Sequence, residues 1–220
     1  NGLGVHRTGF VLDTPILNVN CEVGDHNPGA MVTTGKISFS SSADDLMYSD
    51  LILIWSGNPT FTQIPNAHFI NEARYKGAEI VAIAPDYNAS AIHADEWLPV
   101  EPGSDAALGL AMAQVIVEEE LHDAPFLLEQ TDFPLLVRAD THRFLRKADL
   151  EEGGAEDRFY VFDKRSGTIR GAGARSLAIE GFEPALEGEY QVDTRAGRVE
   201  VATVFERLRK HLARYTPEAI

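Results

Sequence analysis

Three loops of the sequence carry residue types that can bind a nucleotide. The first holds Gly57 and Asn58, the second holds Asp86, and the third holds Gly103 and Asp105. A glycine lets the backbone approach a phosphate, and an asparagine side chain can hydrogen-bond it. A carboxylate can accept from a ribose hydroxyl, or from two adjacent N–H groups of guanine. Each loop alone is more simply explained as a turn or a helix start, but the three together favour a nucleotide site.

Three short apolar segments precede these loops and are predicted to be strands. Residues 50–55 (DLILIW) form the continuous apolar run expected of a strand buried on both faces. Residues 78–85 predict a second buried strand, and residues 95–100 a short third one. In a parallel sheet the loops at the carboxyl ends of the strands offer free N–H groups to ligands. The three loops are therefore expected at that edge.

Helical spacing alternates with these strands. Residues 65–77 have helical periodicity and a stop at Gly77, and residues 104–121 form a strong helix pattern with Ser104 as N-cap and Asp105 in the first turn. Strands that alternate with helices imply parallel pairing and right-handed crossovers. The predicted fold class is α/β, a parallel sheet flanked by helices in a Rossmann-like dinucleotide-binding unit.

The last third of the chain has a different pattern. Residues 158–170 alternate and turn at 165–167, which suggests a hairpin, and residues 189–201 suggest another. Residues 202–216 form an amphipathic helix stopped by Pro217. We therefore expect a hairpin-plus-helix extension at the C-terminus.

These patterns divide the chain into three regions. We predict a loop-rich segment with short helical or strand pieces over 1–48, an α/β cofactor-binding unit over 49–150, and hairpins with an amphipathic helix over 151–220. The last region is expected to belong to the same larger domain as the second.

Composition excludes several classes of protein. The formal net charge of −15 argues against nucleic acid or an anionic membrane surface as a partner. The single cysteine, Cys21, rules out an internal disulfide and any cysteine-rich zinc or iron–sulfur site within this chain. No stretch reaches the roughly 18 apolar residues of a membrane span, so direct membrane insertion is not expected. The sequence starts without Met, which suggests a piece of a longer polypeptide.

The ordered series WSGNP, RYKG, PDY and PGSDAAL, within residues 55–108, resembles the guanine dinucleotide cofactor region of the molybdopterin oxidoreductases, the dimethyl sulfoxide reductase superfamily. The likeness is strongest to the type II branch, which contains nitrate reductase and ethylbenzene dehydrogenase catalytic subunits. In much of the superfamily an Asp precedes the proline of the second loop, whereas here Ala84 does and Asp86 follows, as in the nitrate reductase branch. The resemblance implies these cofactor-binding residues: Trp55, Ser56, Gly57, Asn58, Pro85, Asp86, Tyr87, Gly103 and Asp105.

The same resemblance gives a role to the loop that contains Asp25 and His26. It implies that Asp25 is the protein ligand to molybdenum and that His26 lines the substrate pocket, so both are candidate catalytic residues. A hard carboxylate suits a high-valent, oxygen-rich metal. Asp13 is the rival ligand, and local spacing alone would explain Asp25 as an Asx turn.

The resemblance implies a fragment of a catalytic subunit that binds molybdenum in bis(molybdopterin guanine dinucleotide). The implied reaction is oxygen-atom transfer or hydroxylation of a small-molecule substrate, coupled to electron transfer. An iron–sulfur cluster would lie outside this chain segment, and the implied partners are an iron–sulfur electron-transfer subunit and, as a further candidate, a haem subunit. The implied location is periplasmic or otherwise extracytoplasmic, with the cytoplasmic face of the membrane as the alternative.

Two other functions stay open from the residues alone. A Rossmann-like nicotinamide dehydrogenase domain is disfavoured because no G-x-G-x-x-G follows a strand. A non-catalytic nucleotide-binding module would keep the fold without the metal. The substrate and the direction of the redox reaction are not fixed by the sequence.

Overall fold

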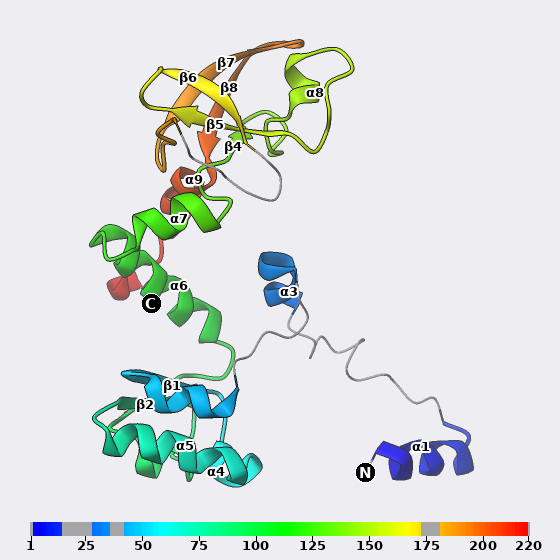
Figure 1. Ribbon diagram of the computed structural model, residues 1–220. Coiled ribbons are helices and arrows are strands. Elements are labelled where there is room, and N and C mark those ends of the chain that lie inside the picture. The colour runs from blue at the N-terminus through cyan, green and yellow to red at the C-terminus, as the bar shows by residue number, and fades with distance from the viewer. Residues whose placement is uncertain (1, 15–27, 36–41, 173–180, 220) are drawn as a thin grey trace. The chain divides into compact units, whose positions relative to one another are not determined.

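The computed structural model describes residues 2–14, 28–35, 42–172 and 181–219 (Figure 1). The chain forms two compact units, Asn1–Val100 and Glu101–Ile220. The division after Val100 falls inside the range 49–150, which the sequence assigned to one unit. The two units are described in turn.

The first unit begins with short helical pieces. They are α1 (Gly2–Val11), α3 (Pro28–Thr34) and the 3-10 helix η1 (Ala43–Tyr48). Between residues 1 and 48 the sequence predicted mostly loop with short helical or strand pieces, and the described part of that segment contains helical pieces.

A parallel three-stranded sheet forms the centre of the first unit. Its strands are β1 (Leu51–Trp55), β2 (Glu79–Ile83) and β3 (Glu96–Leu98), in the spatial order β1-β2-β3. All three strands were predicted from their apolar runs. The pairing is parallel throughout, with Leu51 opposite Glu79 and Val81 opposite Glu96, so the three carboxyl ends meet at one edge.

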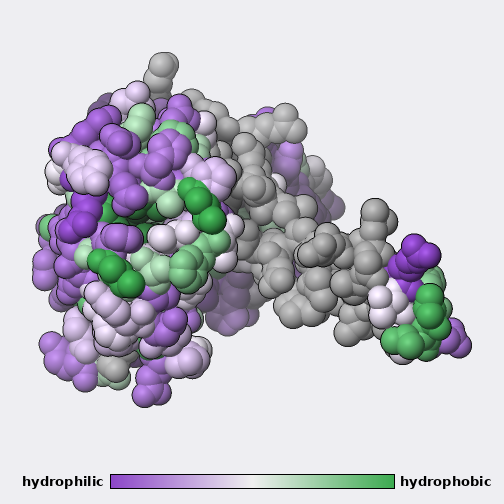
Figure 2. All heavy atoms as spheres, turned by 90° about the horizontal axis from the view of Figure 1, so that it is seen from below, coloured by the Kyte–Doolittle hydropathy of each residue, from purple (hydrophilic) through white to green (hydrophobic). Residues whose placement is uncertain are grey.

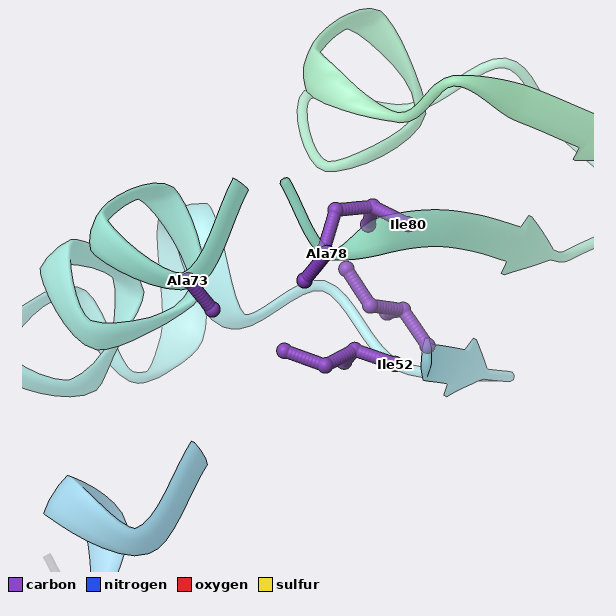
Figure 3. Close-up of a cluster of buried hydrophobic side chains, with 5 residues drawn as sticks. Ile52, Ala73, Ala78 and Ile80 are labelled. Carbon is purple, nitrogen blue, oxygen red and sulfur yellow. The ribbon is translucent and has the colours of Figure 1, made fainter. Parts of the chain in front are cut away.

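Helices connect these strands. The loop after β1 leads into α4 (Pro59–Thr62) and α5 (Ile64–Tyr75), and the loop after β2 leads into the 3-10 helix η2 (Ala91–His93). Helix α5 ends before Gly77, whose φ of +105° is the left-handed conformation that favours glycine, as predicted. The core between α5 and the sheet is built from buried aliphatic side chains (Figure 3): Ile52, Ile54, Ala73, Ala78 and Ile80.

The edge strand β1 is buried on one face only. Leu51 and Leu53 are 54% and 40% exposed, whereas Ile52 and Ile54 are buried against the core. The expectation that this strand is buried on both faces is therefore wrong within the described residues. The central strand β2 behaves as predicted, because residues 80–83 are all buried. The difference follows from position, since β1 has a neighbouring strand on one side and β2 on both.

The second unit opens with helices. Helix α6 (Asp105–Glu118) is followed by α7 (Ala124–Gln130), the short strand β4 (Leu136–Arg138) and α8 (Lys147–Leu150). Ser104 occupies the N-cap position of α6 as predicted, but its side chain does not cap the helix. Its hydroxyl instead donates to the carbonyl of Glu101 at 2.7 Å and tightens the preceding turn.

Two hairpins and a helix complete this unit. Strands β5 (Phe159–Asp163) and β6 (Thr168–Ala172) form the first predicted hairpin, and β7 (Glu189–Thr194) and β8 (Gly197–Thr203) form the second. Strand β4 pairs antiparallel with β8, and β8 continues into α9 (Val204–Leu212), which precedes the 3-10 helix η3 (Pro217–Ala219). Thr203 caps α9 by accepting from the backbone N–H of Glu206 at 3.1 Å.

The core of the second unit combines aliphatic and aromatic side chains. Phe162 and Tyr190 stack with ring centroids 3.7 Å apart, and Phe205 of α9 is only 1% exposed. Charged residues are buried in this unit as well, among them Arg138, Asp163 and Glu206.

The surface mixes polar and apolar side chains. Figure 2 shows hydrophobic residues as separate patches among hydrophilic ones on the face in view. Of the helices that the structure describes, none combines the length and the apolar character needed to cross a bilayer.

Candidate functional site

The loop after β1 begins with a strained residue. Ser56 has φ +50°, an uncommon value for a residue with a side chain, and its backbone N–H donates to the carbonyl of Ile83 at 2.8 Å. That bond extends the pairing of β1 with β2 by one residue. Strained backbone of this kind is found disproportionately at ligand sites. The bond holds the start of the loop against the end of β2.

Gly57 follows, and its Cα has room for a small side chain. A Cβ built on Gly57 would meet its nearest neighbours, the carbonyl of Trp55 and the ring of Pro59, at 3.7 and 3.8 Å, which is ordinary van der Waals contact. The protein itself therefore does not require glycine at this position. In the described part of the chain, the backbone N–H groups of Gly57 and Asn58 have no hydrogen-bond acceptor. Both N–H groups are available to an anion.

Asn58 links the first loop to the second. Its side-chain Oδ1 accepts a hydrogen bond of 2.9 Å from the hydroxyl of Ser90, which lies in the loop after β2. Ser90 is 2% exposed and also contacts Thr60. The structure thus brings together the ends of β1 and β2, as expected for a parallel sheet.

The second loop places three of the predicted residues on the surface. Pro85, Asp86 and Tyr87 are exposed, and the Tyr87 ring meets Trp97 edge-on with centroids 5.2 Å apart. Trp97 is fixed by a hydrogen bond of 2.9 Å from its Nε1 to the carbonyl of Ala84. A carboxylate at this position can accept a hydrogen bond from a ribose or a base. The exposed aromatic ring beside it can stack on the base.

A groove runs along β1 and includes three of the predicted residues, Trp55, Gly57 and Asn58. Its volume is about 680 Å³, and η1 and α5 contribute the facing side chains. None of the described residues that line the groove is Lys or Arg, so a phosphate there would be held by neutral N–H donors. Asp45 of η1 also lines it and disfavours an anion at that end.

The third loop belongs to the second unit. Gly103 has φ +92°, and the N–H of Ser104 donates to the carbonyl of Glu101 at 3.0 Å, which closes a turn before α6. Asp105 is half-buried in the first turn of that helix. Its carboxylate is therefore near the positive end of the helix dipole, where negative charge is favoured.

The predicted metal ligand and its neighbour, Asp25 and His26, lie outside the described residues. The rival, Asp13, is exposed after the end of α1 with φ +51°. Within the described ranges, no cluster of three or more His, Cys, Asp or Glu side chains could hold a metal ion.

Sequence reasoning missed Ser90 and the residue that orients it, Asn88. Asn88 Oδ1 accepts from the backbone N–H of Ser90 at 2.9 Å and of Ala91 at 3.2 Å, an Asx turn. The order Asn-Ala-Ser in the loop that follows a strand is a sequence signal for such a turn and could have identified the pair.

Comparison with known proteins adds an independent line of argument. Residues 12–192 match the family model described as molybdopterin oxidoreductase. The chain is 42% identical over 208 residues to the dimethylsulfide dehydrogenase subunit alpha of Rhodovulum sulfidophilum, with 92% of this chain and 22% of the relative covered. It is 40% identical over 222 residues to the perchlorate reductase subunit alpha of Dechloromonas aromatica, with 89% of this chain and 24% of the relative covered.

A third relative has similar identity. The respiratory nitrate reductase subunit alpha of Haloferax mediterranei is 41% identical over 211 residues, with 89% of this chain and 21% of the relative covered. The chain therefore spans about a fifth to a quarter of the length of these curated relatives.

Proposed function

Because this chain belongs to the molybdopterin oxidoreductase family, we propose that it is part of the catalytic subunit of a molybdenum enzyme. Within that subunit it binds the guanine dinucleotide end of bis(molybdopterin guanine dinucleotide). The observation that carries this proposal is the junction of the loops after β1 and β2. There the free N–H groups of Gly57 and Asn58 stand beside a groove in a chain of this family.

The residues of the first loop fit a pyrophosphate. Gly57 offers a backbone N–H with no side chain over it, and Asn58 offers a second N–H and a side-chain amide. Neutral donors of this kind hold phosphates at the ends of parallel strands in other nucleotide-binding folds. The groove therefore needs no Lys or Arg to accept the ligand.

The guanosine end is assigned to carboxylates and an aromatic ring. Asp86 accepts from the ribose or the base, and Tyr87 offers an exposed ring for stacking. Asp105 accepts from two adjacent N–H groups of guanine, the one base that presents such a pair on that edge. Trp55, Ser56, Pro85 and Gly103 shape the loops that carry these groups.

Asp25 is proposed as the protein ligand to the metal, and His26 as a residue of the substrate pocket. When bound, the cofactor supplies a redox-active metal and so carries the difficult step, while the protein ligates, orients and tunes its electrostatics. A carboxylate ligand suits a hard, oxygen-rich metal centre.

The proposed activity is oxygen-atom transfer or hydroxylation of a small molecule, coupled to electron transfer through iron–sulfur clusters outside this segment. The relatives above are named alpha subunits, so we propose an iron–sulfur electron-transfer subunit as partner and a haem subunit as a further candidate. An extracytoplasmic location is proposed, and the cytoplasmic face of the membrane is the alternative.

Analysis of the purified full-length subunit tests this function. We expect molybdenum near one atom per polypeptide, and guanine nucleotide released on acid hydrolysis. Bound NAD without molybdenum would favour a nicotinamide dehydrogenase. A guanine nucleotide without metal would favour a non-catalytic binding module.

The first prediction concerns the metal ligand. Asp25→Ala in the full-length enzyme should abolish or redirect turnover, because it removes the proposed protein ligand. Molybdenum content should fall much less than activity, since the two pterins still hold the metal. Metal analysis and the Mo(V) resonance signal, measured on the same sample, separate these effects.

Two further variants control that experiment. Asp25→Ser replaces one oxygen ligand with another and should restore the resonance signal more than the rate. Asp13→Ala should leave the signal unchanged, because that residue is the exposed rival at the end of α1. A resonance signal that is altered by Asp13→Ala and unchanged by Asp25→Ala would show that Asp13, and not Asp25, is the ligand.

A further inference from the structure

A single buried hydroxyl joins the two loops of the candidate site. Ser90 is 2% exposed, and its Oγ is 2.9 Å from Oδ1 of Asn58 and 3.1 Å from the hydroxyl of Thr60. The backbone N–H of Thr60 donates to the same oxygen at 3.2 Å. The hydroxyl proton of Ser90 is placed to donate to Oδ1 of Asn58, at the shorter distance, or to the hydroxyl of Thr60, and its oxygen accepts from the backbone N–H of Thr60.

Ser90 is itself held in place from its own loop. The Asx turn of Asn88 binds the N–H groups of Ser90 and Ala91, and the N–H of Asn88 donates to the carbonyl of Asp86 at 2.9 Å. The position of the hydroxyl is therefore fixed by the backbone that also carries the exposed Asp86.

The side chain of Asn58 is used in an unusual way. Asn58 occupies the N-cap position of α4, where a side chain of this type commonly accepts from the first turn, yet it makes no such bond. Its backbone carbonyl accepts from Phe61 and Thr62, and the N–H of Thr60 is bonded by Ser90. The first turn needs no help from Asn58, so its amide oxygen is committed to Ser90.

That commitment sets the direction of the amide. Since Oδ1 faces Ser90, the Nδ2 group faces away from Ser90, and Asn58 lines the groove. In the described part of the chain Nδ2 has no hydrogen-bond acceptor. A flipped amide would turn an acceptor oxygen toward the groove instead.

We propose that Ser90 is a positioning residue, which orients the amide of Asn58 so that Nδ2 donates to a phosphate of the bound dinucleotide. This inference rests on the proposed function. Ser90 acts through Asn58 and is not one of the residues that line the groove. Without its hydroxyl, the amide of Asn58 is free to rotate and presents oxygen to the anion for part of the time.

The test measures guanine nucleotide retained by the full-length holoenzyme after prolonged gel filtration, quantified as GMP released by acid hydrolysis. Ser90→Ala should accelerate loss of the nucleotide about tenfold, and Asn58→Ala at least as much, since a tenfold effect corresponds to one lost donor. In the Asn58→Ala background, Ser90→Ala should have no additional effect. Additive effects would overturn the proposal, because Ser90 would then act independently of Asn58.

Asn58→Asp supplies a sharper variant. It keeps an oxygen for Ser90 to bond but replaces the Nδ2 donor by a second, negatively charged oxygen. We expect retention to fall at least as much as in Asn58→Ala, with an unchanged urea midpoint. Retention at the wild-type level in Asn58→Asp would contradict the proposed direction of the amide.

Controls separate positioning from stability. Ser166→Ala removes another serine hydroxyl bond, 2.7 Å to Asp163 in the second unit, and should lower stability without changing retention. Ser90→Cys keeps the size of the side chain and a weak donor, so it should retain nucleotide better than Ser90→Ala. Equal retention in Ser90→Cys, Ser90→Ala and wild type would overturn the positioning role. Absence of guanine nucleotide from the wild-type enzyme would instead overturn the proposed function.

Discussion

The two units place their polar groups in opposite ways. In Glu101–Ile220 the buried charges are bonded internally: Arg138 binds Asp140 and Asp149, and Glu206 binds Arg209 at 2.9 Å. In Asn1–Val100 the polar groups at the ends of β1 and β2 leave donors directed to a groove or to solvent. The buried charges of the second unit therefore stabilise its structure, whereas the donors at the ends of β1 and β2 in the first unit are those proposed to bind a ligand.

Asp163 shows how completely a charge can be used inside the second unit. Its carboxylate accepts from the N–H groups of Glu183 and Arg165, both at 3.0 Å, and from the hydroxyl of Ser166, and it lies 3.6 Å from Arg170. These donors come from the hairpin turn and from the segment that follows it. Among the residues that the structure describes, no comparable cluster of donors surrounds Asp86, which is exposed in the first unit.

This contrast makes a general prediction about mutations. Substitution of the internal charges in the second unit should lower the free energy of unfolding and leave nucleotide retention unchanged. Substitution in the loops of the first unit should lower retention and leave unfolding nearly unchanged. Three experiments test the contrast, and they are given in order of expected effect.

The largest effect is expected at Arg138. Its side chain is 11% exposed and donates to Asp140 at 2.7 and 3.0 Å and to Asp149 at 2.5 Å. Arg138→Ala should lower the free energy of unfolding by about 3 kcal/mol, because it leaves carboxylates without their cation. Urea unfolding of the full-length subunit measures this, and nucleotide retained per folded molecule should match wild type.

Arg198→Ala is the matched control. Arg198 is an exposed arginine of β8, so its loss should change the free energy of unfolding by only about 0.5 kcal/mol. If both arginine variants lower the free energy of unfolding equally, the buried ion pairs of Arg138 contribute no more to stability than an exposed arginine does. If Arg138→Ala also releases nucleotide, the internal charges of the second unit contribute to nucleotide binding as well as to stability.

Substitution of Gly57 is expected to have the opposite effect, a loss of nucleotide retention without a loss of stability, and the effect should be smaller than that of Arg138→Ala. Gly57→Ala places a methyl group where the structure offers ordinary contact distances. The free energy of unfolding should therefore be unchanged or slightly higher. Nucleotide retention should fall about tenfold, because the methyl group would crowd the N–H that is proposed to donate to the phosphate. Undiminished retention in this variant would remove Gly57 from the site.

The last effect is a change of stability with pH, which appears only in acid and concerns the titration of Asp163. Hydrogen bonds from the N–H of Glu183, the hydroxyl of Ser166 and the N–H of Arg165 lower its pKa from 3.8 to about 2, against the opposing effect of desolvation. A carboxyl group with a lowered pKa in the folded state stabilises the protein above its unfolded pKa. That contribution is lost as the pH falls from about 4 to about 2.

Asp163→Asn isolates this contribution. The difference in urea midpoint between wild type and Asp163→Asn should be constant above about pH 5 and should shrink as the pH falls below about 4. A difference that does not change with pH over this range would show that the folded carboxyl group has an ordinary pKa.

Much of the secondary structure could be predicted from the sequence. The apolar runs of β1 and β2, the glycine that ends α5 and the alternating hairpins of β5 to β8 are local patterns, set by side-chain periodicity and by the backbone freedom of glycine. The burial of the two faces of β1 could not be predicted in the same way. The run LILIW has the same composition whether the strand lies at the edge or the centre of a sheet.

The candidate site was predicted in part. Gly57 and Asn58 follow a recognisable strand, and the resemblance to the family added the aromatic and acidic residues around them. Ser90 was missed, because 32 residues separate it from Asn58 and no local pattern connects the two. Asp25 and His26 remain predictions from that resemblance.

By itself the sequence determined the family and the order of strands and helices, because both depend on residues close together in the chain. It also determined which residue types are available to a nucleotide and a metal. Only the tertiary structure decided which of these groups lie at a groove or on the surface and which are used internally. Asn58 follows one strand and Asp163 ends another, yet among the described residues the Nδ2 of Asn58 has no acceptor, whereas Asp163 is enclosed by donors. The physical reason is that the neighbours which satisfy a polar group come from distant segments, and only folding brings them together.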